Sequence, residues 1–203
     1  MPRIVRVVRR STCVRPDASI RSWPMSAIWY FAYGSNMQSA TLRGRRGIAY
    51  RRALPGRLDR WRLVLDKPPL IPIGGSFANV IPDSTVAVHG VLFEITEDDL
   101  AHLDLTEGVF IGNYERVPVT VWPLLPADAE AIVAYTLTSE RRDPKRLPTQ
   151  RYMRLLIDGA EEHGLPADYI ARLRSVPVRA ETSDAAAFRP LIDQLMRRPG
   201  KTD

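Results

Sequence analysis

The chain has 203 residues, of which 45% are hydrophobic and 26% are charged, and its formal net charge is +6. This length and composition are typical of one globular domain with a substantial core, and they exclude a largely disordered chain. No apolar run approaches the roughly 20 residues needed to cross a bilayer, so we expect no membrane association. A single cysteine, Cys13, excludes an internal disulfide, and three scattered histidines leave no zinc-binding spacing.

The basic charge is concentrated near the N-terminus. Residues 1–24 contain six arginines and one acid, whereas the rest of the chain is almost balanced. A balanced body gives little support to phosphate contacts, so we expect no nucleic-acid partner. The Ile4–Val8 run is too short for a signal peptide. We therefore predict a basic leader at 1–24 that is disordered or not translated, with Met25 as the working start and a targeting leader as the alternative. Residues 25–203 are predicted to form a single domain.

The first predicted elements are a strand and a helix joined at a glycine. Ile28–Tyr33 is a short β-branched and aromatic run, which indicates a buried strand that stops at Gly34. Met37–Arg43 has helical character, and Ser35 and Asn36 before it are good N-cap residues.

The central part of the chain predicts further strands. Leu58–Asp66 and Val86–Ile95 alternate as strands do. Between them, Ile71–Pro82 carries two glycines and two prolines, which indicates an irregular loop around a short strand at Phe77–Val80. Residues 96–99 are the acidic start of a helix whose inner face has two leucines.

The last third of the chain predicts a hairpin followed by helices. Tyr114–Trp122 and Ala131–Leu137 read as antiparallel strands, and the helices are expected at Thr149–His163 and Ala167–Arg174. A final helix has one apolar stripe, formed by Phe188, Leu191, Ile192 and Leu195. About five strands precede the longer helices, which favours an α+β fold with a mostly antiparallel sheet that is able to close into a barrel.

The corner at Gly34 is the first candidate for a functional site. A strand that enters a glycine turn and then a helix start directs several backbone N–H groups to one spot, which suits a carboxylate or a phosphate. The sequence Gly34-Ser35-Asn36 lacks the Gly-Lys-Ser/Thr ending of a Walker loop. A purely structural corner is the alternative.

The second candidate is the segment Leu103-Asp104-Leu105-Thr106-Glu107-Gly108. A carboxylate beside a glycine at the end of an element can be held in a cleft, where it suits a general base. The alternative is that Glu107 is an exposed turn residue, and Asp104 is the rival carboxylate. The three histidines are isolated in the sequence and are expected to have local structural roles; His89 lies in a predicted strand, where an inward orientation is the alternative.

Three motifs in order resemble the γ-glutamylcyclotransferase family, over about residues 28–176. They are Phe31-Ala32-Tyr33-Gly34-Ser35-Asn36-Met37; Leu103-Asp104-x-x-Glu107-Gly108 with Gly112-x-Tyr114 after it; and Gln150-x-Tyr152, Asp158-Gly159-Ala160 and His163-Gly164-Leu165-Pro166-x-x-Tyr169. Ser35-Asn36 is similar to the γ-glutamyl amino-acid branch, because the glutathione-specific branch usually has leucine after that serine. The leader lies outside the family pattern.

This resemblance implies a small, closed, mostly antiparallel β-barrel with flanking helices. It also implies a cofactor-free acyl-transfer enzyme, of lyase or transferase type, that converts γ-glutamyl amino acids or γ-glutamyl amines to 5-oxoproline and the free amine. Glu107 is the implied general acid and base, with no metal. The implied substrate-binding residues are Tyr30, Phe31, Ala32, Tyr33, Gly34, Ser35, Asn36 and Tyr152, with Gly75 and Tyr114 as further candidates.

The expected partner is therefore a small γ-glutamyl substrate, in a cytoplasmic protein that is a monomer or a homodimer. Two other functions remain open. One is removal of a γ-glutamyl protecting group in a biosynthetic pathway by the same chemistry. The other is a non-catalytic small-ligand-binding protein of the same fold, against which Glu107 argues, because binding alone gains little from a carboxylate beside a carboxylate-binding loop.

Overall fold

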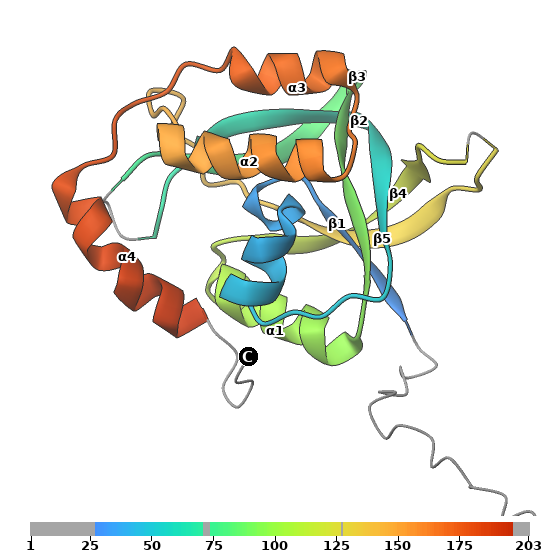
Figure 1. Ribbon diagram of the computed structural model, residues 1–203, viewed down its shortest axis with the longest axis horizontal. Coiled ribbons are helices and arrows are strands. Elements are labelled where there is room, and N and C mark those ends of the chain that lie inside the picture. The colour runs from blue at the N-terminus through green and yellow to red at the C-terminus, as the bar shows by residue number, and fades with distance from the viewer. Residues whose placement is uncertain (1–26, 71–73, 127, 197–203) are drawn as a thin grey trace, which may run out of the picture.

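The computed structural model describes residues 27–70, 74–126 and 128–196 (Figure 1). The leader predicted over residues 1–24 lies outside this range. No helix within the described residues is long and apolar enough to span a membrane.

Five strands form a closed barrel. They are β1 (Ile28–Ala32), β2 (Ala53–Lys67), β3 (Phe77–Ile95), β4 (Glu115–Pro123) and β5 (Ile132–Thr138). Their order around the barrel is β1-β3-β2-β4-β5 with antiparallel neighbours, and β5 closes the ring by pairing in parallel with β1. The α+β fold with a closed, mostly antiparallel barrel is therefore confirmed.

The barrel encloses the hydrophobic core. Along β4, Val119 and Val121 are buried whereas Thr120 and Trp122 are exposed, as period-2 alternation predicts. The fully buried side chains come mainly from the strands and include Phe31, Leu58, Val80, Leu92 and Phe93.

One sequence prediction in the barrel is wrong. An irregular loop and two separate strands were expected over residues 71–95, but β3 is continuous from Phe77 to Ile95. Pro82 is tolerated there because it pairs with Trp61 directly beside a register shift, where Arg60 has a φ of 65°. The regular ladder is already interrupted at that point, so the N–H that proline lacks is not missed.

Three helices are close to their predicted places. They are α1 (Glu97–Glu107), α2 (Gln150–Glu162) and α3 (Ala167–Arg174). Thr96 caps α1 by accepting a hydrogen bond from the Asp99 N–H, and Gly108 ends the helix with a φ of 70°. In Figure 1 the segment that follows β1 lies between α2 and α1. This sandwich brings residues far apart in sequence to one site.

The segment after β1 is not the regular helix predicted over Met37–Arg43. It forms a 3₁₀ turn, η1 (Ser35–Met37), and a π-helical turn, η2 (Ala40–Arg45), separated at Gln38 by extended backbone. Helix α2 packs closely against this segment. A Cβ at Gly159 would lie 2.6 Å from the Gln38 amide nitrogen and 2.8 Å from the Met37 carbonyl carbon.

Replacing Gly159 with alanine is expected to destabilise the protein by about 1–3 kcal/mol, because the added methyl group meets backbone atoms that cannot rotate away. Thermal unfolding measures this as a lower Tm. Gly44→Ala is the matched control, since its Cβ meets no atom within 4 Å. Equal Tm values for the two variants would show that η1 can shift away from α2 without a loss of stability.

The last helix, α4 (Ser183–Met196), confirms the predicted element, and the apolar stripe is largely exposed. Phe188, Leu191 and Leu195 are exposed, and Ile192 is half-buried. In Figure 1 this helix stands beside the barrel rather than across it. Its apolar residues therefore do not belong to the main core.

Candidate active site

A cavity of about 410 Å³ lies where η1, α1, α2, α4 and the ends of β2 and β3 meet, and this volume is within the range of small-molecule sites. The predicted residues that line it are Tyr30, Tyr33, Gly34, Ser35, Asn36, Gly75, Glu107, Tyr114 and Tyr152. Phe31 and Ala32 are fully buried in the barrel core and do not line the cavity. The fold thus brings together residues from five separate parts of the sequence.

Glu107 is the last residue of α1, and its side chain is 14% exposed. Its Oε1 lies 2.6 Å from Arg46 Nη2 and accepts a hydrogen bond from Asn36 Nδ2 at 3.2 Å. Because Gly108 adopts the left-handed conformation, the chain turns away after Glu107 while its side chain stays at the cavity. The carboxylate is therefore held by two groups rather than exposed in a turn.

Asn36 and Arg46 form one network around this carboxylate. The Asn36 amide donates to Tyr30 Oη at 3.1 Å and accepts from Arg46 Nε at 3.1 Å. Arg46 also donates to Thr106 Oγ1 at 2.9 Å, and its side chain is only 7% exposed. Sequence reasoning missed Arg46, because it sits in a run of basic residues and nothing in that run distinguishes one arginine from its neighbours.

Tyr152 connects α2 to the Gly34 corner. Its hydroxyl oxygen accepts a hydrogen bond from the Ala78 N–H at 3.0 Å and another from the backbone of Ser35. Burial, the largest cause, raises the pKa of Tyr152 to about 12, so the hydroxyl is neutral at physiological pH. Because both backbone contacts use the oxygen as acceptor, the hydroxyl proton remains for a ligand in the cavity.

Three other tyrosines belong to the same wall. Tyr33 donates to the Leu137 carbonyl at 2.5 Å, and Tyr114 donates to the Ala78 carbonyl at 3.0 Å. Burial raises the pKa of Tyr30, Tyr33 and Tyr114. All of these hydroxyls are therefore neutral hydrogen-bonding groups rather than sources of negative charge at neutral pH.

Lys67 and Asn113 are cavity residues that the sequence did not single out. Lys67 Nζ donates to Asn113 Oδ1 at 2.7 Å, while Asn113 Nδ2 donates to the Glu107 carbonyl at 2.8 Å. Burial, with help from Arg141 and against the attraction of Glu107, lowers the pKa of Lys67 to about 8. A lysine at a strand end directly before two prolines was the available signal.

The rival side chains do not line the cavity. Asp104 forms an ion pair with Arg116 at 2.6 Å, and burial raises the pKa of its carboxyl group. His89 packs its ring against Tyr169 of α3, and burial lowers its pKa. Among the described residues, no group of three His, Cys, Asp or Glu side chains is placed to hold a metal ion. Glu107 is thus the better-placed carboxylate of the two.

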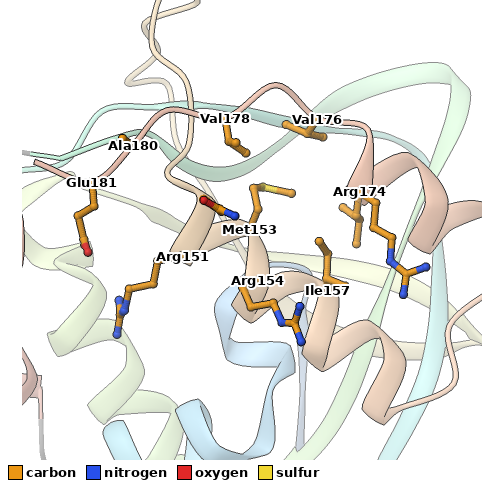
Figure 2. Close-up of a pocket in the computed structure, with 11 residues that line it drawn as sticks. Arg151, Met153, Arg154, Ile157, Arg174, Val176, Val178, Ala180 and Glu181 are labelled. Carbon is orange, nitrogen blue, oxygen red and sulfur yellow. The ribbon is translucent and has the colours of Figure 1, made fainter.

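A second hollow, of about 750 Å³, lies along the outer side of α2 (Figure 2). Met153, Ile157 and Val178 supply apolar lining. Arg154 at its rim pairs with Asp158 at 2.8 Å, and Arg174 pairs with Glu161. Since these rim charges already have partners on the same surface, this hollow offers less convergent chemistry than the Glu107 cavity.

Replacing Gly34 with valine is expected to abolish ligand binding in the Glu107 cavity. Even a Cβ would lie 3.3 Å from Tyr152 Oη and 3.4 Å from Ala78 Cβ, and the two further methyl groups need more space than this corner has. Isothermal titration calorimetry with a γ-glutamyl dipeptide measures the loss, with circular dichroism to check folding. A folded variant with near-normal affinity would remove this corner from the site.

The geometry defines a class of protein: a closed β-barrel in which an arginine-paired carboxylate and several neutral tyrosines line a ligand-sized cavity. Residues 87–173 match the family model described as the AIG2-like family. A protein of Aspergillus oryzae named γ-glutamyl cyclotransferase aclK is 31% identical over an alignment of 165 residues, and the match covers 72% of this chain and 60% of that protein. This chain thus spans less than two thirds of the fungal relative.

Two further comparisons agree. A bovine γ-glutamylcyclotransferase is 29% identical over 164 residues, covering 77% of this chain and 82% of the bovine protein. A solved structure titled γ-glutamyl cyclotransferase has the same fold, with a TM-score of 0.68 at 21% identity over 83% of this chain and 99% of that one. The resemblance that the motifs indicated is confirmed: the chain matches the AIG2-like family model over residues 87–173, is similar to proteins named γ-glutamylcyclotransferase and shares the fold of a solved structure with that title.

Proposed function

We propose that this protein is a γ-glutamylcyclotransferase, which converts a γ-glutamyl amino acid or γ-glutamyl amine to 5-oxoproline and the free amine. The observation that carries the proposal is the position of Glu107. Its carboxylate lies at the wall of a ligand-sized cavity, paired with Arg46 at 2.6 Å, and Asn36 of the Gly34 corner donates to the same oxygen. The names of the relatives support the same activity.

The reaction is intramolecular, so positioning accounts for much of its rate. The substrate's α-amine attacks its own γ-carbonyl carbon and closes a five-membered ring. A cavity that holds the glutamyl chain folded back on itself supplies this proximity. We propose that the Gly34–Asn36 corner binds the anionic groups of the substrate. The Tyr152 hydroxyl, whose proton is not used by its backbone contacts, can donate a hydrogen bond to the same part of the ligand.

Glu107 is the proposed general base and then general acid. Its carboxylate takes a proton from the α-ammonium group, and the free amine attacks the γ-carbonyl. As the tetrahedral intermediate collapses, Glu107 returns that proton to the departing nitrogen and the C–N bond breaks. The ring nitrogen loses its second excess proton to solvent, and the released amine takes one up. Arg46 keeps the carboxylate in position during both transfers.

The test is a panel of γ-glutamyl amino acids together with glutathione, with 5-oxoproline as the measured product. Because Ser35-Asn36 is similar to the γ-glutamyl amino-acid branch, we expect turnover of γ-glutamyl dipeptides and little of glutathione. Preferential turnover of glutathione would contradict this branch assignment. No 5-oxoproline from any member would contradict the proposed function and favour a binding protein.

A further inference from the structure

We propose that Lys67 binds a carboxylate on the departing half of the substrate, and so selects γ-glutamyl amino acids over uncharged γ-glutamyl amines. The inference rests on the proposed function and makes its substrate class more specific. Lys67 is one of the residues that line the cavity, and it is only 1% exposed.

In the described part of the chain, Lys67 has no carboxylate beside it to balance its charge. Its Nζ donates to Asn113 Oδ1 and to the Pro68 carbonyl at 3.2 Å, both of which are neutral acceptors. Within residues 27–70, 74–126 and 128–196, no carboxylate forms an ion pair with this ammonium group; Glu107 attracts it only from a longer range. A buried cation without a counter-charge is unfavourable. A carboxylate in the cavity would supply that charge.

The surroundings of the same ammonium group also favour an anion. This group lies 4.3 Å from the ring centre of Tyr114, which is a favourable position for a cation. Arg141 also donates to Asn113 Oδ1, at 2.8 Å, so two cations share one amide oxygen. This concentrates positive charge beside one wall of the cavity and favours an anionic ligand over a neutral one.

A series of contacts along the cavity wall connects the Gly34 corner to Lys67. The Ser35 backbone and the Ala78 N–H both reach Tyr152, the Ala78 carbonyl accepts from Tyr114, and the Tyr114 ring lies under Lys67. Lys67 is therefore separated from the Gly34 corner by two aromatic side chains. If that corner holds the glutamyl half of the substrate, Lys67 faces the half that departs.

Glu107 stands between these two ends, which is where the proposed proton transfer needs it. Its carboxylate contacts Asn36 on the corner side, and its backbone carbonyl contacts Asn113, the partner of Lys67. The attacking nitrogen belongs to one half of the substrate and the leaving nitrogen to the other. A carboxylate between the two subsites is placed to serve both.

The test compares γ-glutamyl-alanine with γ-glutamyl-alaninamide, which differ only in the charge at the departing end. For the wild type we expect kcat/KM to be about tenfold or more higher for the acid. Lys67→Met should bring this ratio close to one, whereas Lys67→Arg should largely retain it. Lys145→Met is the matched control, because Lys145 is an exposed lysine that does not line the cavity.

The pH dependence of the same ratio gives a second readout. Arg141, Glu107 and the neutral Tyr114 face Lys67, and the resulting pKa is about 8. The ammonium form is present below that pH, so the preference for the acid should decline as pH rises from 7 to 9.5. The substrate's α-amine is common to both compounds and cancels in the ratio. In Lys67→Arg the ratio should stay flat.

Several outcomes would overturn the inference: a wild type without preference, a pH-independent ratio, or a Lys67→Met variant that loses activity equally on both compounds. The last would show that Lys67 only supports Asn113 and Tyr114. If the wild type turns over neither compound, the proposed function fails, and calorimetric binding of the same pair decides the subsite. If the wild type binds the acid more tightly than the amide, and Lys67→Met removes this difference, the proposed carboxylate subsite is retained. Equal binding of the two compounds would reject the subsite.

Discussion

Replacing Glu107 with glutamine is expected to lower kcat by about 10²- to 10⁴-fold, the usual contribution of a positioned acid–base group. Glutamine keeps the shape of the side chain and can still contact Asn36, but it cannot accept the α-ammonium proton. Binding of a γ-glutamyl dipeptide should survive, because the proposed anchor is the Gly34 corner. Steady-state kinetics on the best dipeptide of the panel, with calorimetry for affinity, measure both effects.

Asp104→Asn is the matched control, since it changes a carboxylate three residues away on the same helix. It removes a partly exposed ion pair with Arg116, which should cost less than about 1 kcal/mol of stability and leave kcat nearly unchanged. An inactive Asp104→Asn beside a fully active Glu107→Gln would mean that the wrong carboxylate has been assigned. Full activity of both would place the base elsewhere in the cavity.

Replacing Arg46 with methionine is expected to destabilise the protein by about 3–5 kcal/mol and to abolish most of its activity. The guanidinium group is nearly buried and joins Glu107, Asn36 and Thr106, so its loss leaves a carboxylate and an amide without their partner. Chemical denaturation measures the free energy of unfolding, and the kinetic assay measures the effect on turnover.

Two further variants test whether the Arg46–Glu107 ion pair contributes to stability beyond the two side chains taken separately. Arg46→Met combined with Glu107→Gln should be less destabilised than the two single changes added together, because the double variant leaves no unpaired carboxylate. Arg116→Met removes a more exposed arginine from its carboxylate and should cost less than about 1 kcal/mol. Strict additivity in the cycle would show that Arg46 and Glu107 are not energetically coupled.

Local patterns were sufficient for most elements of the fold. The strand at Ile28, the hairpin of β4 and β5, and helices α2 and α3 follow from side-chain alternation, caps and breakers, which act within a few residues. The same local rules were wrong for residues 71–95, where two prolines and two glycines indicated a loop. There the pairing with β2 decided the strand, and a register shift accommodated Pro82.

The η1–η2 segment shows the same limit on a smaller scale. Its residues favour a regular helix, but the chain forms a 3₁₀ turn and a π-helical turn there, with Gly159 of α2 packed against the backbone of Met37 and Gln38. The conflict is between a local preference of a few tenths of a kcal/mol per residue and the packing of a whole helix. Packing prevails, and as a result Asn36 reaches Glu107.

The sequence was enough to predict the fold class and to name Glu107, the Gly34 corner and Tyr152, because these residues belong to ordered motifs that span most of the chain. The folded structure was needed to show that Arg46 pairs with Glu107, that Asp104 pairs elsewhere, and that Lys67 is buried at the cavity without a carboxylate partner in the described residues. The physical reason is that charge pairing and burial depend on distances between residues far apart in the chain. Arg46 and Lys67 acquire their environments only when the barrel closes and α1 and α2 enclose η1, and no local pattern encodes that.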